Sequence, residues 1–339
     1  MNSTYKSRLV EPYTVTAEKL ASGEFLKSES PTVRDRKHIS FTCDVKDIGD
    51  GVIRVGQGYE VTSSSWVEIT KGGVKAYTYF SWTEPKKMTV IPQTSIGCDV
   101  SDFVTVIIDK DNTENGTFIT VMTAGSMFRR KVDGLSLENG EVFASAEGCE
   151  IYNCKLNWLC DGYADDIWIF GDSYLQYETE TFWPYYLYRD NFNKVLLSGY
   201  PGMKTQRGLE DFKLSLKRGT PTFALWCLGM NNKEVAGSGL PEENWLKSTE
   251  EFLEICKEKG ITPILATIPY CPKVCNEYKN DWVRKSGHRY IDFARAVGSD
   301  KDINWYPDML LSDGAHPKKR GAEALYTQVL IDFPEIMKR

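Results

Sequence analysis

Residues 167–174 read Ile-Trp-Ile-Phe-Gly-Asp-Ser-Tyr, and this stretch decides the fold of the C-terminal half of the chain. The apolar run Ile167–Phe170 predicts a short strand that is buried on both faces, and Gly171 begins the turn that ends it. Strands of this kind belong to parallel sheets that helices cover on both sides. Because ligands bind at the C-terminal ends of such strands, Ser173 lies where a functional site is expected.

Short apolar segments and amphipathic helices alternate after this stretch. Further strands are predicted at residues 195–198, 222–228, 262–267 and 290–293. Residues 242–259 and 319–333 each place their apolar side chains on one helical face, and Gly260 is positioned to cap the first of these helices. The alternation predicts that residues 161–339 form a three-layer α/β/α sandwich around a five-stranded parallel sheet.

The N-terminal half has a different pattern, in which short segments rich in β-branched and aromatic residues are separated by turn formers. Asn115-Gly116 and Asn139-Gly140 are typical hairpin turns, because both residue types tolerate positive φ. About nine strands with almost no helix predict an all-β sandwich of jelly-roll type from about residue 35. The predicted strands are 38–45, 52–55, 66–70, 74–81, 103–109, 117–123, 128–132, 142–146 and 151–158. The change of pattern divides the chain into residues 1–160 and 161–339.

The composition excludes some classes of partner. The net charge of −6 argues against a nucleic-acid partner, since phosphate binding needs clustered Lys and Arg. No apolar run reaches the length of a membrane span, and the first residues lack the apolar stretch of a secretory signal. A cytoplasmic location is therefore favoured, and secretion is left open for a chain whose signal has been removed. The nine cysteines lack zinc-ligand spacing, and a Cys271–Cys275 disulfide is also left open.

Four loops of the C-terminal half carry side chains that are suited to chemistry. They are residues 171–174 (Gly-Asp-Ser-Tyr), 198–202 (Ser-Gly-Tyr-Pro-Gly), 228–232 (Leu-Gly-Met-Asn-Asn) and 312–317 (Ser-Asp-Gly-Ala-His-Pro). A serine in a tight turn presents its hydroxyl to a base, glycine and asparagine can donate to a developing oxyanion, and an Asp three residues before a His can fix its tautomer. Each loop alone can equally be an ordinary turn, a helix cap or a surface histidine.

In this order and after these strands, the four loops resemble the four sequence blocks of the SGNH, or GDSL-type, hydrolase superfamily, whose sheet is flavodoxin-like. The resemblance covers about residues 167–333. It implies a Ser173 nucleophile, a His316 general base and acid, and an Asp313 that orients His316. It also implies an oxyanion hole formed by the backbone N–H of Ser173, the backbone N–H of Gly202 and the side chain of Asn231.

Two positions depart from this pattern or compete within it. Gly199 is a second, weaker candidate for the glycine donor. Asn232 stands where the family usually has Asp, which puts local hydrogen bonding in question more than activity. The predicted walls of the site are Tyr174, Met230 and Trp305, because they neighbour the motif residues. No metal or organic cofactor is required.

The pairing of a β-sandwich with such a domain resembles bacterial carbohydrate esterases. It implies a serine esterase that removes short acyl groups, mainly acetyl, from an acylated oligosaccharide or polysaccharide. The same triad also serves lipid esterases, lysophospholipases and thioesterases of the superfamily, and a non-catalytic glycan-binding protein is a further alternative. No apolar lid is visible between the motifs, which argues against a long-chain lipid substrate. The sequence leaves the oligomeric state, the sugar and the acylated position open.

Overall fold

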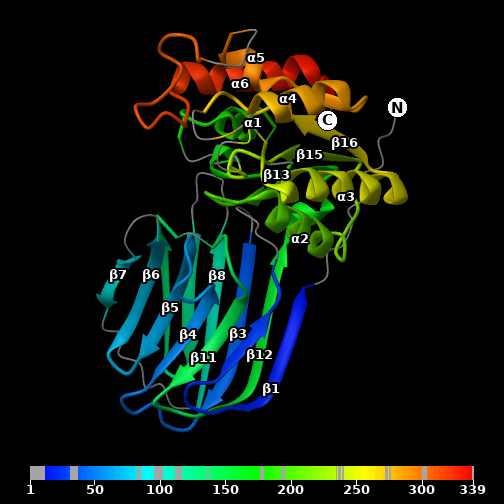
Figure 1. The fold of residues 1–339 in the computed structure, drawn as a ribbon. Helices are drawn as coiled ribbons and strands as arrows, with labels where there is room; N and C mark the ends of the chain where they lie inside the picture. The colour runs from blue at the N-terminus through cyan, green and yellow to red at the C-terminus, as the bar shows by residue number, and fades with distance from the viewer. Residues whose placement is uncertain are drawn as a thin grey trace, which may run out of the picture. The chain divides into compact units, whose positions relative to one another are not determined.

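The computed structural model contains two compact units, Met1–Asp161 and Gly162–Arg339, which we describe separately (Figure 1). It describes residues 12–337 apart from 31–36, 82–84, 95–101, 111–116, 136, 176–178, 192–194, 234, 236–237, 239, 272–273, 275 and 300–303. The Asn115-Gly116 turn and Cys275 therefore lie outside the described residues. None of the helices that the structure describes is both long and apolar enough to cross a membrane.

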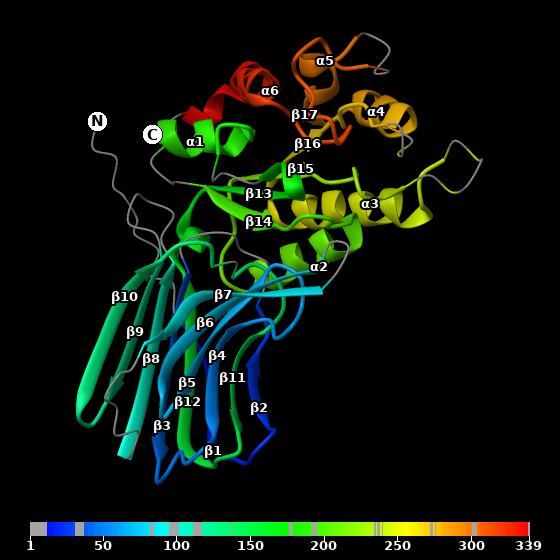
Figure 2. The same ribbon diagram turned by 90° about the vertical axis from the view of Figure 1, so that its left-hand side faces the viewer.

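The first unit consists of two antiparallel sheets (Figures 1 and 2). One sheet has the order β1-β12-β3-β8-β9-β10 and the other β2-β11-β4-β5-β6-β7. The strands are β1 (Tyr13–Leu20), β2 (Phe25–Ser28), β3 (Lys37–Val45), β4 (Val52–Gln57), β5 (Ser64–Thr70), β6 (Gly73–Ser81), β7 (Pro85–Thr94), β8 (Asp102–Lys110), β9 (Thr117–Thr123), β10 (Ser126–Val132), β11 (Val142–Glu147) and β12 (Ile151–Cys160).

The chain passes between these sheets as in a jelly roll, because β1 and β2, β3 and β4, and β11 and β12 are consecutive in sequence but lie in different sheets. The hairpins β6-β7 and β9-β10 extend the two edges. Alternate residues of β3 are buried from Lys37 to Val45, as expected for a strand with one face in a core. Lys37 donates to Gln57 of the opposite sheet, which joins the two layers. The predicted β-sandwich is confirmed.

Three strands of this unit are absent from the sequence prediction. The side chains of β1 are mostly exposed or half-buried, so its sequence lacks a clear apolar face, and the same holds for the short β2. β7 contains Pro85 and Pro92, which argue against a strand in a sequence reading. It lies at the edge of its sheet, where proline is tolerated because the outer side of an edge strand has no neighbouring strand that needs a backbone N–H donor.

The second unit is built on a parallel sheet of order β14-β13-β15-β16-β17. Numbered within the unit, this order is 2-1-3-4-5, the flavodoxin-like arrangement, so the predicted fold is confirmed. The strands are β13 (Ile167–Gly171), β14 (Leu196–Gly199), β15 (Phe223–Cys227), β16 (Thr262–Ala266) and β17 (Arg289–Ile291). The helices are α1 (Trp183–Asn191), α2 (Thr205–Ser215), α3 (Glu243–Lys259), α4 (Asn276–Lys285), α5 (Phe293–Val297) and α6 (Lys319–Asp332), with short 3-10 turns η1 (Asp161–Ala164), η2 (Ser173–Leu175) and η3 (Pro334–Met337).

Two helix boundaries follow from local chemistry. Gly260 ends α3 with φ of 67°, the left-handed conformation predicted for it. The fifth strand is shorter than predicted, because the Asp292 side chain accepts a hydrogen bond from the backbone N–H of Arg295 and so starts α5 at Phe293.

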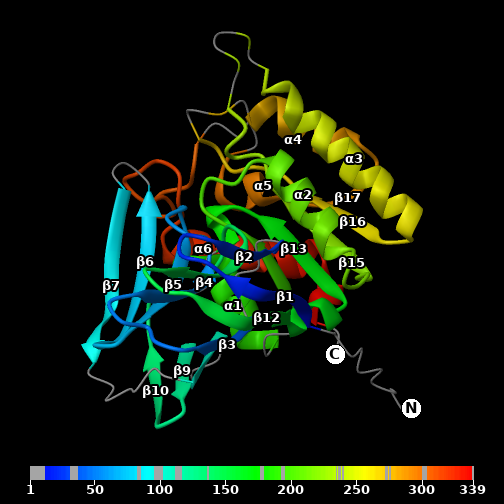
Figure 3. The same cartoon turned by 90° about the horizontal axis from the view of Figure 1, so that it is seen from below.

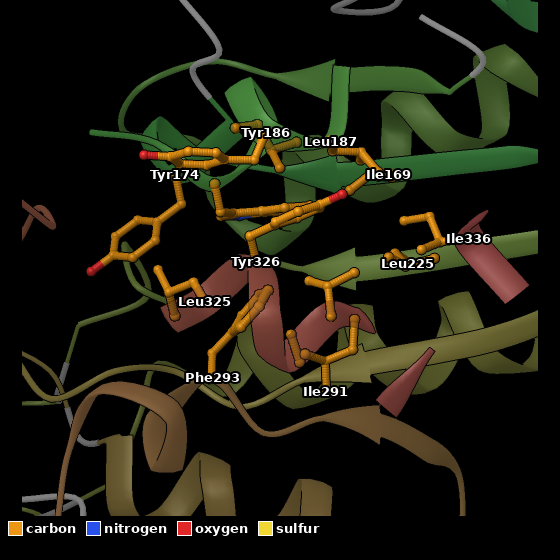
Figure 4. Packing of buried hydrophobic residues seen from close by; sticks show 14 of the residues in the cluster. Ile169, Tyr174, Tyr186, Leu187, Leu225, Ile291, Phe293, Leu325, Tyr326 and Ile336 are labelled. Carbon is orange, nitrogen blue, oxygen red and sulfur yellow. The ribbon is translucent and has the colours of Figure 1, made fainter. Parts of the chain in front are cut away.

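Helices cover both faces of the parallel sheet. On one face, alternate strand residues such as Ile169 and Leu225 pack with α1, α5 and α6 in a single apolar cluster (Figure 4). On the other face, Trp226 stacks on Phe252 of α3, with ring centroids 4.4 Å apart, and Phe170 meets Phe212 of α2. Helices α2 and α3 lie side by side on that face (Figure 3). The sheet is therefore a rigid platform for the loops at its C-terminal edge.

Candidate active site

Ser173 lies at the topological switch point of the sheet. Its strand, β13, pairs with β14 on one side and with β15 on the other, and neighbouring connections diverge there. An open α/β sheet forms its ligand crevice at this point, outside the carboxyl ends of the strands. All five residues of β13 are buried, and the turn η2 begins at Ser173 directly after the strand.

A chain of hydrogen bonds joins Ser173, His316 and Asp313. The Nε2 atom of His316 lies 2.8 Å from Ser173 Oγ, and its Nδ1 atom lies 2.7 Å from Asp313 Oδ2. With Nδ1–H donating to the carboxylate, Nε2 is free to accept the serine proton. Ser173 and His316 are 143 positions apart in the sequence, and the fold brings them into hydrogen-bond contact.

The loop before α6 holds Asp313 and His316 in this geometry. The backbone N–H of Leu311 donates to the carbonyl of His316 at 2.8 Å and closes the loop. Gly314 takes a φ of 73° at its tip, where a glycine avoids strain. The remaining oxygen of Asp313, Oδ1, accepts from the backbone N–H groups of Ala315 and His316 at 2.9 and 3.0 Å.

Hydrogen bonding keeps Asp313 ionised. Partial burial acts to raise the pKa of its carboxyl, but the backbone N–H groups of His316 and Ala315 and the imidazole outweigh that effect. The pKa of Asp313 is therefore lowered from its ordinary value. A carboxylate that stays charged at neutral pH can orient the imidazole and stabilise its protonated form.

Asn231 and Asp172 connect the loops after β13, β14 and β15. Asn231 Nδ2 donates to Asp172 Oδ2 and to the carbonyl of Met203, both at 3.1 Å. Asp172 is buried, and its other oxygen accepts from the backbone N–H of Tyr174 at 3.1 Å. No separate role is predicted for Asp172 from the sequence, although its position directly before Ser173 is a usable signal.

The two glycines of the second loop serve different local needs. Gly202 has a φ of 83° and lies in a turn in which the N–H of Met203 donates to the carbonyl of Tyr200 at 3.1 Å. Gly199 ends β14 directly beside Gly171, the last residue of β13. A Cβ atom at position 199 would stand 2.0 Å from the Gly171 carbonyl oxygen, so only glycine fits there.

We expect Gly199→Ala to lower both stability and activity. The added Cβ must displace the Gly171 backbone, two residues before Ser173, and overpacking of this kind costs about 1–3 kcal/mol. Thermal unfolding followed by circular dichroism should show a midpoint that is lower by several degrees, and ester hydrolysis should fall with it. Gly125→Ala is the matched control, since a Cβ there meets nothing within 4 Å. Equal midpoints for the two variants would contradict the prediction.

Asn232, the departure from the family pattern, caps a helix. It is fully buried, and its Oδ1 accepts from the backbone N–H of Thr205, the first residue of α2, at 3.1 Å. Its Nδ2 donates to Gln206 Oε1 at 3.2 Å. An amide oxygen therefore accepts a helix N-terminal N–H here.

The three predicted wall residues lie in different surroundings. Tyr174 and Met230 line a cavity of about 20 Å³ together with Asp172, Cys227, Leu228, Ala266, Thr267, Ile268, Pro269 and Phe293. The hydroxyl of Tyr174 donates to the Ala315 carbonyl, and burial raises the pKa of this phenol well above its ordinary value. Trp305 is not among the lining residues of this cavity; its Nε1 donates to the Tyr270 carbonyl at 2.8 Å.

Comparison with known proteins identifies the domain. Residues 169–324 match the model of the GDSL-like lipase/acylhydrolase family. Similar solved structures include a GDSL-like lipase from Bacteroides thetaiotaomicron (13% identity, TM-score 0.39, covering 48% of this chain and 84% of that one) and a psychrotrophic esterase from Pseudoalteromonas (15%, 0.39, 52% and 100%). A catalytic mutant of an acetylxylan esterase from Geobacillus stearothermophilus is also similar (12%, 0.40, 50% and 93%). Comparison with curated proteins found no match. Residues 169–324 thus form a domain of the GDSL-like lipase/acylhydrolase family.

Proposed function

We propose that the protein is a serine esterase that removes short acyl groups from carbohydrate hydroxyls through an acyl-Ser173 intermediate. The observation that carries this proposal is the hydrogen-bonded chain from Ser173 through His316 to Asp313. A neutral serine hydroxyl is a weak nucleophile, and a base within hydrogen-bond reach activates it.

In the proposed reaction, Ser173 Oγ bonds to the ester carbon while its proton passes to His316 Nε2. The tetrahedral intermediate then expels the alcohol, which takes this proton from His316. Water next attacks the acyl-Ser173 carbon and gives a proton to His316, and cleavage of the acyl–Oγ bond returns that proton to Ser173 and releases the acid. Asp313 stabilises the imidazolium in both halves of the reaction.

The negative charge on the carbonyl oxygen is stabilised by the backbone N–H groups of Ser173 and Gly202 and by Asn231 Nδ2. Both N–H groups of Asn231 have protein acceptors, Asp172 and the Met203 carbonyl. The oxyanion shares one of these N–H groups as its charge develops. Preorganised donors of this kind are among the largest contributions to acyl transfer.

The size of the cavity supports a short acyl group. One water molecule needs a cavity of about 10–15 Å³, so a cavity of about 20 Å³ accommodates a group as small as methyl. Tyr174 and Met230, on its walls, belong to the loops that carry Ser173 and Asn231. The acetyl methyl is therefore the group that we place there.

We expect acetyl esters to be hydrolysed faster than octanoyl esters, by about tenfold or more in kcat/KM. A deep acyl site would favour longer chains by about 0.8 kcal/mol per buried methylene, whereas a cavity of about 20 Å³ fits the acetyl methyl. Nitrophenyl acetate and nitrophenyl octanoate give the two rates. Met230→Ala enlarges the cavity and should shift the ratio toward octanoate, whereas Met127→Ala, at an exposed position, should not. Faster cleavage of octanoate by the unaltered protein would favour a lipid esterase.

An aromatic face of the first unit supports a carbohydrate as the alcohol part. Trp66 of β5 pairs with Tyr77 of β6, and the next pair along the two strands is Val67 with Ala76. Adjacent pairs point to opposite faces of a sheet. Gln57, which pairs with Ser65 on the Val67 side, bonds to the opposite sheet, so Trp66 and Tyr77 face away from the core of the sandwich.

This outward face combines rings with charges. Tyr59 covers Trp66 and Phe143, which are 1% and 2% exposed, with ring centroids 5.1 and 5.9 Å away, so the rings that the face offers to a ligand are Tyr59 and Phe25. Beside these rings, Arg54 bonds to Glu68 at 3.0 Å and to Glu147 at 2.6 Å. Flat apolar rings suit the C–H faces of sugars, and charged groups suit their hydroxyls. We therefore assign polysaccharide binding to this face.

We expect Phe25→Ala and Tyr59→Ala to weaken binding to an acetylated polysaccharide by about 1–2 kcal/mol each, since both remove partly exposed ring surface. Affinity electrophoresis of the full chain measures this effect. Phe103→Ala is the control, because Phe103 is as exposed (40%, against 38% for Phe25) but lies on the other sheet. Hydrolysis of nitrophenyl acetate should be unchanged in all three. If the polysaccharide slowed the three variants equally in the gel, this face would have no role in sugar binding.

A further inference from the structure

Lys279 is a fully buried lysine that lies beneath the loop carrying Asn231. It belongs to α4, and its Nζ donates to the carbonyl of Gly229 at 2.7 Å and to the carbonyl of Asn232. The ammonium also lies 6.0 Å from the centroid of the Trp245 ring. One side chain therefore holds both ends of the four-residue loop that follows β15.

The same loop is fixed by further contacts. The carbonyl of Gly229 also accepts from the backbone N–H of Asn232 at 3.2 Å, which closes the loop into a tight turn. Gly229 has a φ of 133°, and a Cβ there would stand 2.7 Å from both Ile268 Cδ1 and Trp245 Nε1. The loop thus lies directly against α3 and the segment after β16, without room to shift toward them.

A lysine is a costly residue to place at this position. Removing an ammonium from water costs several kcal/mol, and an apolar side chain of similar volume often stabilises a protein equally well or better. Here the ammonium donates to the two carbonyls that border Met230 and Asn231. These bonds fix the ends of the loop that carries the two residues.

We propose that Lys279 is a positioning residue that holds the Asn231 amide where it stabilises the oxyanion. The proposal rests on the proposed esterase function. Loss of the ammonium frees the carbonyls of Gly229 and Asn232, so the loop relaxes and Asn231 shifts toward its other acceptors. A displacement of about 1 Å at a catalytic group can cost up to roughly 10²-fold in rate.

A double-mutant cycle tests this role. Lys279→Met keeps the length of the side chain and removes its donors, and Asn231→Ala removes the amide that the lysine is proposed to position. We expect Lys279→Met alone to lower kcat on nitrophenyl acetate by about tenfold or more with little change in KM. In the Asn231→Ala background, the same change should have little further effect, because residues that act as a unit are not additive.

Lys285→Met provides the matched control. Lys285 lies on the same helix, its side chain is 77% exposed, and it pairs with Asp281 one turn before it. We expect wild-type kcat for this variant. Lys279→Gln takes the place of Lys279→Met in the cycle if thermal unfolding shows that the methionine variant is not folded.

Labelling of Ser173 by a fluorophosphonate separates this inference from the proposed function. The labelling rate depends on the serine and its oxyanion donors and needs no turnover of an ester. A wild type that is labelled but hydrolyses no ester overturns the proposed function, and labelling rates of the four proteins still complete the cycle. The role of Lys279 is overturned if Lys279→Met leaves kcat and labelling unchanged, or if its loss is equally large with and without Asn231.

Discussion

Ser173→Ala and His316→Ala should each lower kcat/KM for nitrophenyl acetate by roughly 10⁴–10⁶-fold, the range measured for residues of a serine triad in another hydrolase. Alanine at position 173 removes the atom that attacks the ester. Alanine at position 316 removes the imidazole that bonds to Ser173 Oγ, and with it the proton acceptor. The double variant should lose little more than either single variant, because the two groups act as one unit.

These losses should occur without unfolding. Neither side chain belongs to the apolar cluster that joins the sheet to α1 and α6 (Figure 4). Thermal unfolding midpoints of the two variants should therefore stay close to that of the wild type. A serine-directed phosphonate should reproduce the loss in the unaltered protein, whereas a chelator should leave the rate unchanged. Wild-type kinetics in Ser173→Ala would refute the assignment of the nucleophile.

Asp313→Asn should be less severe than either of these changes. An asparagine oxygen can still accept from the backbone N–H groups of Ala315 and His316, so the loop keeps its shape. The amide lacks the negative charge that stabilises the imidazolium, which lowers kcat. The variant distinguishes the orienting role of Asp313 from the proton transfer by His316. A loss as large as that of His316→Ala would show that the carboxylate is indispensable.

The sequence predicted the parallel-sheet unit well because local and global signals agree there. The run Ile167–Phe170 is apolar at every position, and the strand it forms is buried on both faces. The sandwich was predicted less completely, since its edge strands β1 and β7 bury little or contain proline. The periodicity of an edge strand is weak because only part of one face meets a core.

The candidate site shows the same division. The sequence singled out Ser173, Asp313 and His316 because each follows a predicted strand or precedes a predicted helix, and the structure places the three within hydrogen-bond distance. Lys279 gave no signal: lysine is almost never fully buried, and α4 has a strongly polar sequence. Its bonds to Gly229 and Asn232 join residues nearly fifty positions apart, which no local pattern reveals.

Asn231→Ala should lower kcat by about 10²–10³-fold with little change in KM, the effect expected when one oxyanion donor is removed. The donor acts mainly on the charged intermediate, so its loss weakens the transition state more than the bound ester. The change also leaves Asp172 without the 3.1 Å bond to the amide. Part of the effect can therefore arise from a shift of the turn that holds Ser173.

Asn232→Asp is the matched control for this measurement, since it alters the adjacent residue of the same loop. A carboxylate oxygen at position 232 can accept from the N–H of Thr205 as the amide oxygen does, and a negative charge is favourable at the start of α2. We expect kcat within about threefold of the wild type, because the N-terminus of a helix favours a negative charge and the family usually has Asp at this position. Asn231→Asp, by contrast, places a carboxylate beside that of Asp172 and should be at least as inactive as Asn231→Ala. If Asn231→Ala retained wild-type kcat while Asn232→Asp lost it, the oxyanion donor would have to be sought in the backbone N–H groups alone.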